Sequence, residues 1–245
     1  MIHLLANNLT PVPYLLVDTP VMAASDPEVQ PWGFIVYRTV YTPESNAVWD
    51  SVTTELQDYA NNSSPSGIAG GKWTAPRLWY MDDASLYDGL SLDQVRDIFA
   101  DYSTAATDLF NEGAFEEFSR GARWDICLVI DEEAMYSIVN YASDDASESI
   151  RLFNRPRRKG PKPPIPYVKA VERCYEPPDP NPPGAARYSP PCHYPGWMKA
   201  GILWLGTLHA CVEMEHECPH WYPNLGLGDD WFPVYEGEMN LSFLD

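Results

Sequence analysis

Histidine, cysteine and glutamate gather most densely in the segment LHACVEMEHECPH at 208–220. On a helix, His209, Glu213 and His216 share one face, because residues four and seven positions apart lie one above the other. Imidazole, thiolate and carboxylate groups are all zinc ligands, although this spacing is not that of a known zinc finger, ribbon or metalloprotease. Zinc is therefore the one cofactor that the sequence suggests, held by Cys211, His216, Cys218 and His220. The alternative is a polar helix face with a cysteine pair at the surface.

Paired carboxylates form a second group, with DDASE at Asp144–Glu148 and further acidic clusters at 82–83, 131–133 and 229–230. Two like charges a few ångströms apart raise the pKa of one of them, so such a pair can share a proton or hold Mg²⁺. The candidate catalytic residues are Asp144, Asp145 and Glu148. In a chain with 35 acidic residues, solvated turns are the alternative. The acids at 131–133 are predicted to stabilise the N-terminus of a helix instead.

A third group is a basic, proline-interrupted loop that begins just after the acidic segment Asp144–Glu148. Six of the 16 basic residues fall within twelve positions: Arg151, Arg155, Arg157, Arg158, Lys159 and Lys162. A local positive potential can contact RNA phosphates even on an acidic protein. The candidate RNA-binding residues are Arg155, Arg157, Arg158 and Lys159. The alternative is a solvated surface loop whose charges repel one another.

The elements that must position these groups follow from hydrophobic periodicity. Strands are predicted at 32–41, 77–81, 124–130, 167–175 and 197–205, where β-branched and aromatic residues form short runs. Helices are predicted after Ser45, over 92–102 behind the capping-box residues Ser91 and Gln94, and after the acids at 131–133. A further helix is predicted through Leu208 and Val212. Cys127, inside an apolar run, is predicted to be a core thiol.

This order of elements predicts an α+β fold, a mixed sheet with helices packed on one face, with a ferredoxin-like arrangement as the first choice. A doubly wound α/β sheet is the alternative, but no glycine-rich dinucleotide loop follows any predicted strand. Residues 1–30 are expected to form an irregular arm. Residues 31–245 are expected to form one domain with a proline-rich, basic insertion at about 151–195, because thirteen of the 24 prolines lie in 156–195.

The chain of 245 residues carries 35 acidic and 16 basic side chains, which gives a formal charge of −19. This balance argues against DNA binding or a general nucleic-acid-coating surface. The longest apolar runs are far shorter than the roughly 20 residues that a spanning helix needs, and the N-terminus lacks the basic start of a signal peptide. Five cysteines are an odd and sparse set. We therefore expect a cytoplasmic protein with reduced thiols and no membrane partner.

Four segments resemble a widespread fungal protein family to which no chemistry is assigned: WGFIVYRTVYTPES at 32–45, WDICLVIDEEAM at 124–135, YVKAVERCY at 167–175 and YPGWMKAG at 194–201. The DDASE segment also resembles the DDxxE pattern of fungal arginine-containing cyclodipeptide synthases, which belong to secondary metabolism and condense aminoacyl-tRNAs. This resemblance implies that Asp144, Asp145 and Glu148 engage the amino or guanidinium groups of an arginyl substrate, and that the basic loop steers the tRNA.

Two hypotheses of function follow. The first is an acyl-transferring enzyme that forms peptide bonds from two aminoacyl-tRNAs, in which a carboxylate deprotonates or orients the attacking amine. The second is a non-catalytic binding or regulatory domain, stabilised by zinc at the cysteine and histidine segment. A small-molecule enzyme with an aromatic-lined cleft stays open as a third, because the chain has nine tryptophans.

Overall fold

The computed structural model describes residues 29–30, 32–63, 65, 72–111, 122–142, 165–175, 194–213 and 234–235. Residues 1–28 of the predicted arm and most of the predicted insertion at 151–195 lie outside these residues, whereas Val29–Gln30 at the end of the arm form the short strand β1. The strand predicted within the insertion is present as β6 (Tyr167–Glu172). None of the described helices is both long enough and apolar enough to cross a bilayer.

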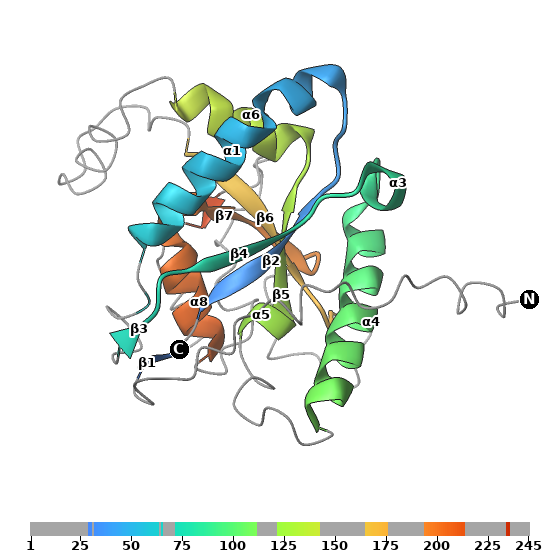
Figure 1. Cartoon of the computed structure of the whole chain (residues 1–245), viewed down its shortest axis with the longest axis vertical. Coiled ribbons are helices and arrows are strands. Elements are labelled where there is room, and N and C mark those ends of the chain that lie inside the picture. Colours follow the sequence, from blue (N-terminus) through green and yellow to red (C-terminus); the bar gives the residue numbers. More distant parts are fainter. Residues whose placement is uncertain are drawn as a thin grey trace, which may run out of the picture.

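Six strands form one mixed sheet within the described ranges (Figure 1). In spatial order they are β4 (Arg77–Met81), β2 (Gly33–Arg38), β5 (Ile126–Ile130), β6, β7 (Trp197–Gly201) and β8 (Val234–Tyr235). The first three are parallel, β6 is antiparallel to β5 and β7, and β8 is parallel to β7. Two short strands, β1 (Val29–Gln30) and β3 (Lys72–Trp73), form a separate parallel pair. The prediction of a mixed sheet is confirmed.

The central strands β2 and β5 are apolar except for Arg38 at the end of β2, because helices cover both of their faces. Phe34 and Val36 of β2 point to one face and Ile35 and Tyr37 to the other, and each of the four is at most 3% exposed. Cys127 of β5 is fully buried, which confirms the predicted core thiol, and burial raises the pKa of that thiol well above its usual range.

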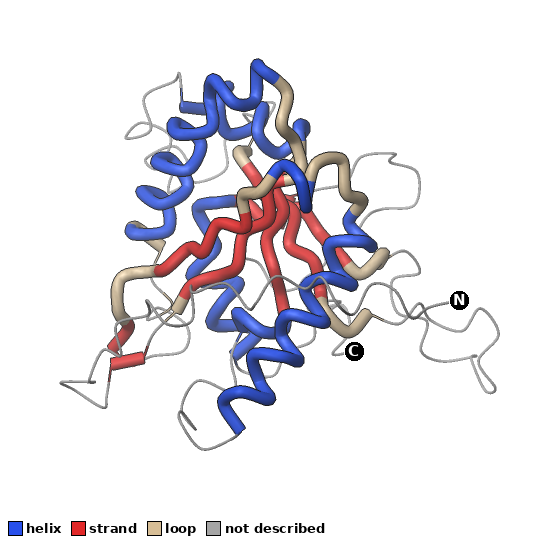
Figure 2. Tube along the Cα trace, turned by 45° about the vertical axis from the view of Figure 1, so that its right-hand side comes forward, coloured by secondary structure: helices blue, strands red, loops and turns tan. Residues whose placement is uncertain are grey.

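Helices α1 (Pro43–Asn61), α6 (Glu132–Ala142) and α8 (Leu205–Glu213) pack on one face of the sheet, together with the single turn η3 (Ile202–Trp204). Helix α4 (Leu92–Asn111) and the short α3 (Ala84–Tyr87) cover the other face (Figure 2). The prediction of helices on one face, and with it the ferredoxin-like arrangement, is wrong in this respect. From β2 the chain reaches β4 on one side through α1, then crosses back to β5 through α4. Right-handed connections in opposite directions place the two helices on opposite faces.

The helix starts follow the polar residues that the sequence offers there. Ser91 and Gln94 satisfy each other's backbone N–H groups at the start of α4, at 3.3 and 2.9 Å, which confirms the predicted capping box. Asp131 Oδ1 accepts a 3.0 Å hydrogen bond from the N–H of Ala134 at the start of α6. The strand predicted from Trp124 begins only at Ile126, because its pairing with β6 ends there and the short helix α5 (Ala122–Asp125) precedes it.

Candidate functional site

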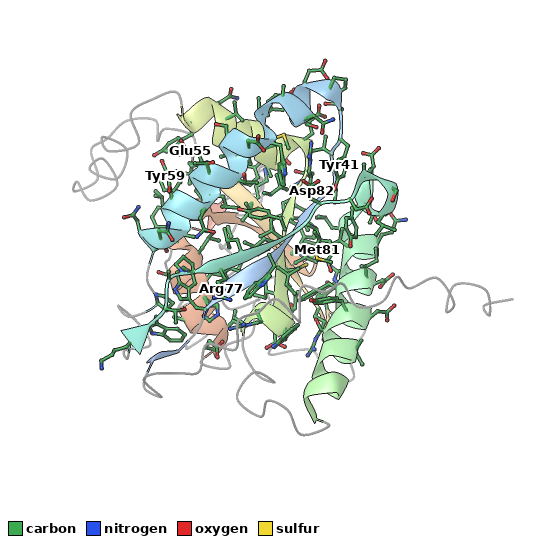
Figure 3. The ribbon with its side chains drawn as sticks, viewed as in Figure 1. Tyr41, Glu55, Tyr59, Arg77, Met81 and Asp82 are labelled. Atoms are coloured by element: carbon green, nitrogen blue, oxygen red, sulfur yellow. The ribbon has the colours of Figure 1, made fainter. Side chains whose placement is uncertain are left out.

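The carboxyl ends of β4, β2 and β5 meet at one edge of the sheet, because the three strands are parallel. In open α/β sheets, ligands bind beyond this edge. Charged residues stand at each of the strand ends: Arg38 ends β2, Asp82 follows β4 and Asp131 follows β5. Tyr41 and Asp82 lie together at this edge, whereas Arg77 marks the opposite end of β4 (Figure 3).

Arg38 is buried, and its guanidinium is committed to neighbouring protein groups. Its hydrogen-bond acceptors are the backbone oxygen of Val40 and the side chains of Ser45, Asn46 and Asp82. The guanidinium also lies over the rings of Tyr41 and Trp49, at 4.3 and 4.5 Å from their centroids. Arg38 therefore fixes the loops that follow β2 and β4, and we assign it a structural role.

A second cluster at this edge joins α6 to β6 and β7, and we call it the lysine cluster: Asp131, Glu133, Tyr167, Lys169 and Lys199. Lys169 Nζ pairs with Asp131 Oδ2 and lies 3.0 Å from Glu133 Oε2. Lys199 Nζ lies 2.6 Å from Glu133 Oε1 and 4.6 Å from the centroid of the Tyr167 ring. Asp131 thus caps α6, Glu132 and Glu133 lie in its first turn as predicted, and Asp131 and Glu133 also bind two lysines.

The charges of this cluster stabilise one another. Burial raises the pKa of Glu133, but hydrogen bonds from Lys199, Tyr167 and Lys169 outweigh it and lower that pKa to about 2. Burial opposes the charge of Lys169, yet the hydrogen bond and charge of Asp131 raise its pKa above the usual range. Both groups are therefore ionised at neutral pH.

Near the opposite end of the strands, His209 of α8 is fully buried among aromatic rings. The rings of Trp32, Phe34 and Trp73 meet it edge to face, with centroids 5.5 to 5.7 Å away. Neither ring nitrogen has a hydrogen-bond partner in the described part of the chain. Glu213 Oε1 is 3.6 Å from His209 Nε2, too far for a hydrogen bond.

The surroundings of His209 keep its imidazole neutral. Burial and the nearby charge of Arg123 lower its pKa to about 3. Burial also raises the pKa of Glu213, whose Oε1 accepts a 2.9 Å hydrogen bond from the N–H of Ala122. His209 and Glu213 share one face of α8, as the spacing predicted, but the positive charge of Arg123 beside both opposes a metal cation between them.

The residues predicted from the sequence to form a site fall mostly outside the described ranges. This holds for the candidate catalytic acids Asp144, Asp145 and Glu148, for the basic residues Arg155, Arg157, Arg158 and Lys159, and for His216, Cys218 and His220. Cys211 is described and is fully buried in the core beside the sheet. Among the described residues, no group of three or more histidines, cysteines or acids is placed to hold a metal ion.

The lysine cluster is the feature that sequence reasoning missed. Lys169 and Lys199 are thirty positions apart, and only the pairing of β6 with β7 brings them together. A signal was present, because each lysine interrupts a strand that is otherwise largely apolar, YVKAVE and WMKAG. A lysine seldom stays buried without a charged partner.

Comparisons with known proteins identify no relative of this chain. No family model, no curated protein and no solved structure matches this chain.

Proposed function

We propose that this chain is an enzyme that makes cyclic dipeptides from aminoacyl-tRNAs, with Asp144, Asp145 and Glu148 binding an arginyl substrate. The resemblance of DDASE to the synthase pattern motivates the proposal, and a cytoplasmic location, where charged tRNAs are found, belongs to it. One structural observation supports it most. The segment that carries both the acids and the basic residues connects α6 to β6 in the sequence, and both of these elements belong to the sheet domain.

The start of β6 is held against the middle of α6. Ser137 Oγ of α6 accepts a 3.1 Å hydrogen bond from the N–H of Tyr167 and donates a 3.2 Å hydrogen bond to its carbonyl oxygen. Tyr167 begins β6 at the edge where the parallel strands end, because β6 runs antiparallel to β5. The chain that follows the acids and the basic residues therefore enters the sheet beside the edge at which such sheets bind ligands.

The chemistry needs only the two charged tRNAs. The amine of one aminoacyl group attacks the ester carbonyl of the other, an amide bond forms, and the ester C–O bond breaks to release the tRNA hydroxyl. A carboxylate takes the amine proton and returns it to the departing oxygen. A second attack of the same kind closes the ring and releases the second tRNA. Asp144, Asp145 and Glu148 are proposed to orient the amine or the guanidinium, and Arg155, Arg157, Arg158 and Lys159 to contact tRNA phosphates.

The test is expression in a bacterial host with mass spectrometry of the extracts for arginine-containing diketopiperazines. Wild type is compared with an Asp144→Ala/Asp145→Ala variant, and Asp229→Ala/Asp230→Ala is the matched control for loss of an acidic pair. Circular dichroism checks that all three fold. We expect the product from wild type and from the control, and none from the Asp144/Asp145 variant.

The opposite result favours the second hypothesis. If folded wild type gives no product, the synthase proposal is wrong and the DDxxE match is chance. Zinc content of the purified protein then tests the non-catalytic, zinc-stabilised domain, for which Cys211, His216, Cys218 and His220 are the candidate ligands.

A further inference from the structure

Lys169 and Lys199 form a like-charged pair in a place where such a pair is unfavourable. They are direct partners across β6 and β7 and lie on the same face of the sheet. Their side chains are only 10% and 13% exposed. Like charges directly opposite each other on neighbouring strands destabilise a sheet, and two apolar residues would serve the core better. An anion between the two ammonium groups would offset their repulsion.

The carboxylate of Glu133 fills that position. One of its oxygens accepts from Lys199 at 2.6 Å and the other from Lys169 at 3.0 Å, and the hydroxyl of Tyr167 is a further donor. Two ammonium groups and a phenol around both oxygens are the arrangement with which a protein binds the carboxylate of a ligand.

Glu133 differs from the groups that hold it in one respect, which is its exposure. Its side chain is 54% exposed on the first turn of α6, whereas both lysines are nearly buried. Rotation of this side chain into solvent would leave the donors in place. Asp131 would still pair with Lys169, so the vacated site would carry one net positive charge, which matches a single carboxylate.

We propose that Lys169, Lys199 and Tyr167 form a binding site for the carboxylate of a small ligand, and that Glu133 occupies this site until the ligand displaces it. The site lies beside the carboxyl edge of the parallel strands, where ligands of α/β sheets bind. The inference does not depend on the synthase activity, because the acyl group of an aminoacyl-tRNA is an ester and has no free carboxylate.

Chemical rescue tests the proposal. Glu133→Ala should lower Tm, and sodium acetate should restore it more than sodium chloride does at the same ionic strength. Glu132→Ala is the matched control, because Glu132 lies on the same turn and is exposed; its Tm should respond equally to both salts. Adding Lys199→Met to Glu133→Ala should abolish the preference for acetate.

A second variant covers the case in which Glu133→Ala does not fold. Glu133→Gln keeps the shape of the side chain but removes its charge, so it binds the two lysines more weakly. NMR titration should show that this variant binds acetate about tenfold more tightly than wild type does. Equal responses to acetate and chloride in both variants would overturn the proposal and leave Glu133 as a structural partner only. Rescue by inorganic phosphate but not by acetate would overturn the carboxylate assignment.

Discussion

His209 is a polar, titratable side chain that is buried among apolar aromatic rings. Its imidazole is fully buried, and neither nitrogen finds a hydrogen-bond partner among the described residues, so it loses its hydrogen bonds to water and gains ring contacts in exchange. Among the described histidines and acids it is also the group whose protonation the fold opposes most plainly, through burial and the charge of Arg123. The residue should therefore make folding stability depend on pH.

The direction follows from its two pKa values. The unfolded chain protonates this imidazole near its ordinary pKa of 6.5, whereas the folded chain does so only near 3. The unfolded state thus gains a proton as pH falls below 6.5, and the free energy of unfolding decreases by about 1.4 kcal/mol per pH unit. We predict a loss of about 2 kcal/mol between pH 6.5 and 5 that His209→Leu removes. Urea unfolding at both pH values measures it, and an unchanged pH dependence in the variant would contradict the prediction.

Glu133 also lowers the free energy of unfolding as the pH falls, but at lower pH than His209 does. Its folded pKa of about 2 lies below its ordinary value of 4.5, so its ion pairs stabilise the fold above pH 4.5, and this contribution disappears as pH falls towards 2. Glu133→Gln should flatten the acid part of the stability curve in this range, while Glu132→Gln should leave it unchanged. Equal curves for the two variants would show that the lysines do not hold Glu133 in solution.

At the scale of elements, the approach of β2 to β4 depends on a glycine. Gly33 has a φ of +143°, and a Cβ there would lie 1.8 Å from the carbonyl oxygen of Arg77. Gly33→Ala should destabilise the fold by about 3 kcal/mol or more, from backbone strain and steric overlap. Gly89→Ala is the control, because its φ is +69° but nothing lies within 4 Å of the added atom; it should cost about 1 kcal/mol. Similar losses in both, measured by urea unfolding, would contradict this account.

Elements were predictable where a local pattern determines them. The runs in β2 and β5 are apolar because both faces are covered, and the capping box of α4 lies within four residues of sequence. The faces that the helices cover were not predictable in this way, because they depend on the order in which strands join the sheet. The meeting of Lys169 with Lys199 depends on strand register, which no local pattern contains. The two-residue strands β1, β3 and β8 are too short for any periodicity.

The whole molecule carries a formal charge of −19, which is the acidic excess that remains after all 16 basic residues are counted against the 35 acids. Repulsion among excess acids destabilises a compact state, and salt screens it, since the Debye length falls from about 10 Å at 0.1 M to about 3 Å at 1 M. We predict that Tm rises between 0.1 and 1 M NaCl in a thermal scan at pH 7. A fall in Tm would mean that attractive pairs such as Arg38–Asp82 outweigh the repulsion.

The central claim concerns the acids between α6 and β6, and a reaction with purified components tests it most directly. Purified protein is incubated with tRNA charged with all amino acids, in which the arginine is isotopically labelled, and the released products are identified by mass spectrometry. The account predicts a labelled diketopiperazine from wild type and from the Asp229→Ala/Asp230→Ala control, and none from the Asp144→Ala/Asp145→Ala variant. Folded wild-type protein that leaves the labelled arginyl-tRNA without such a product would contradict it.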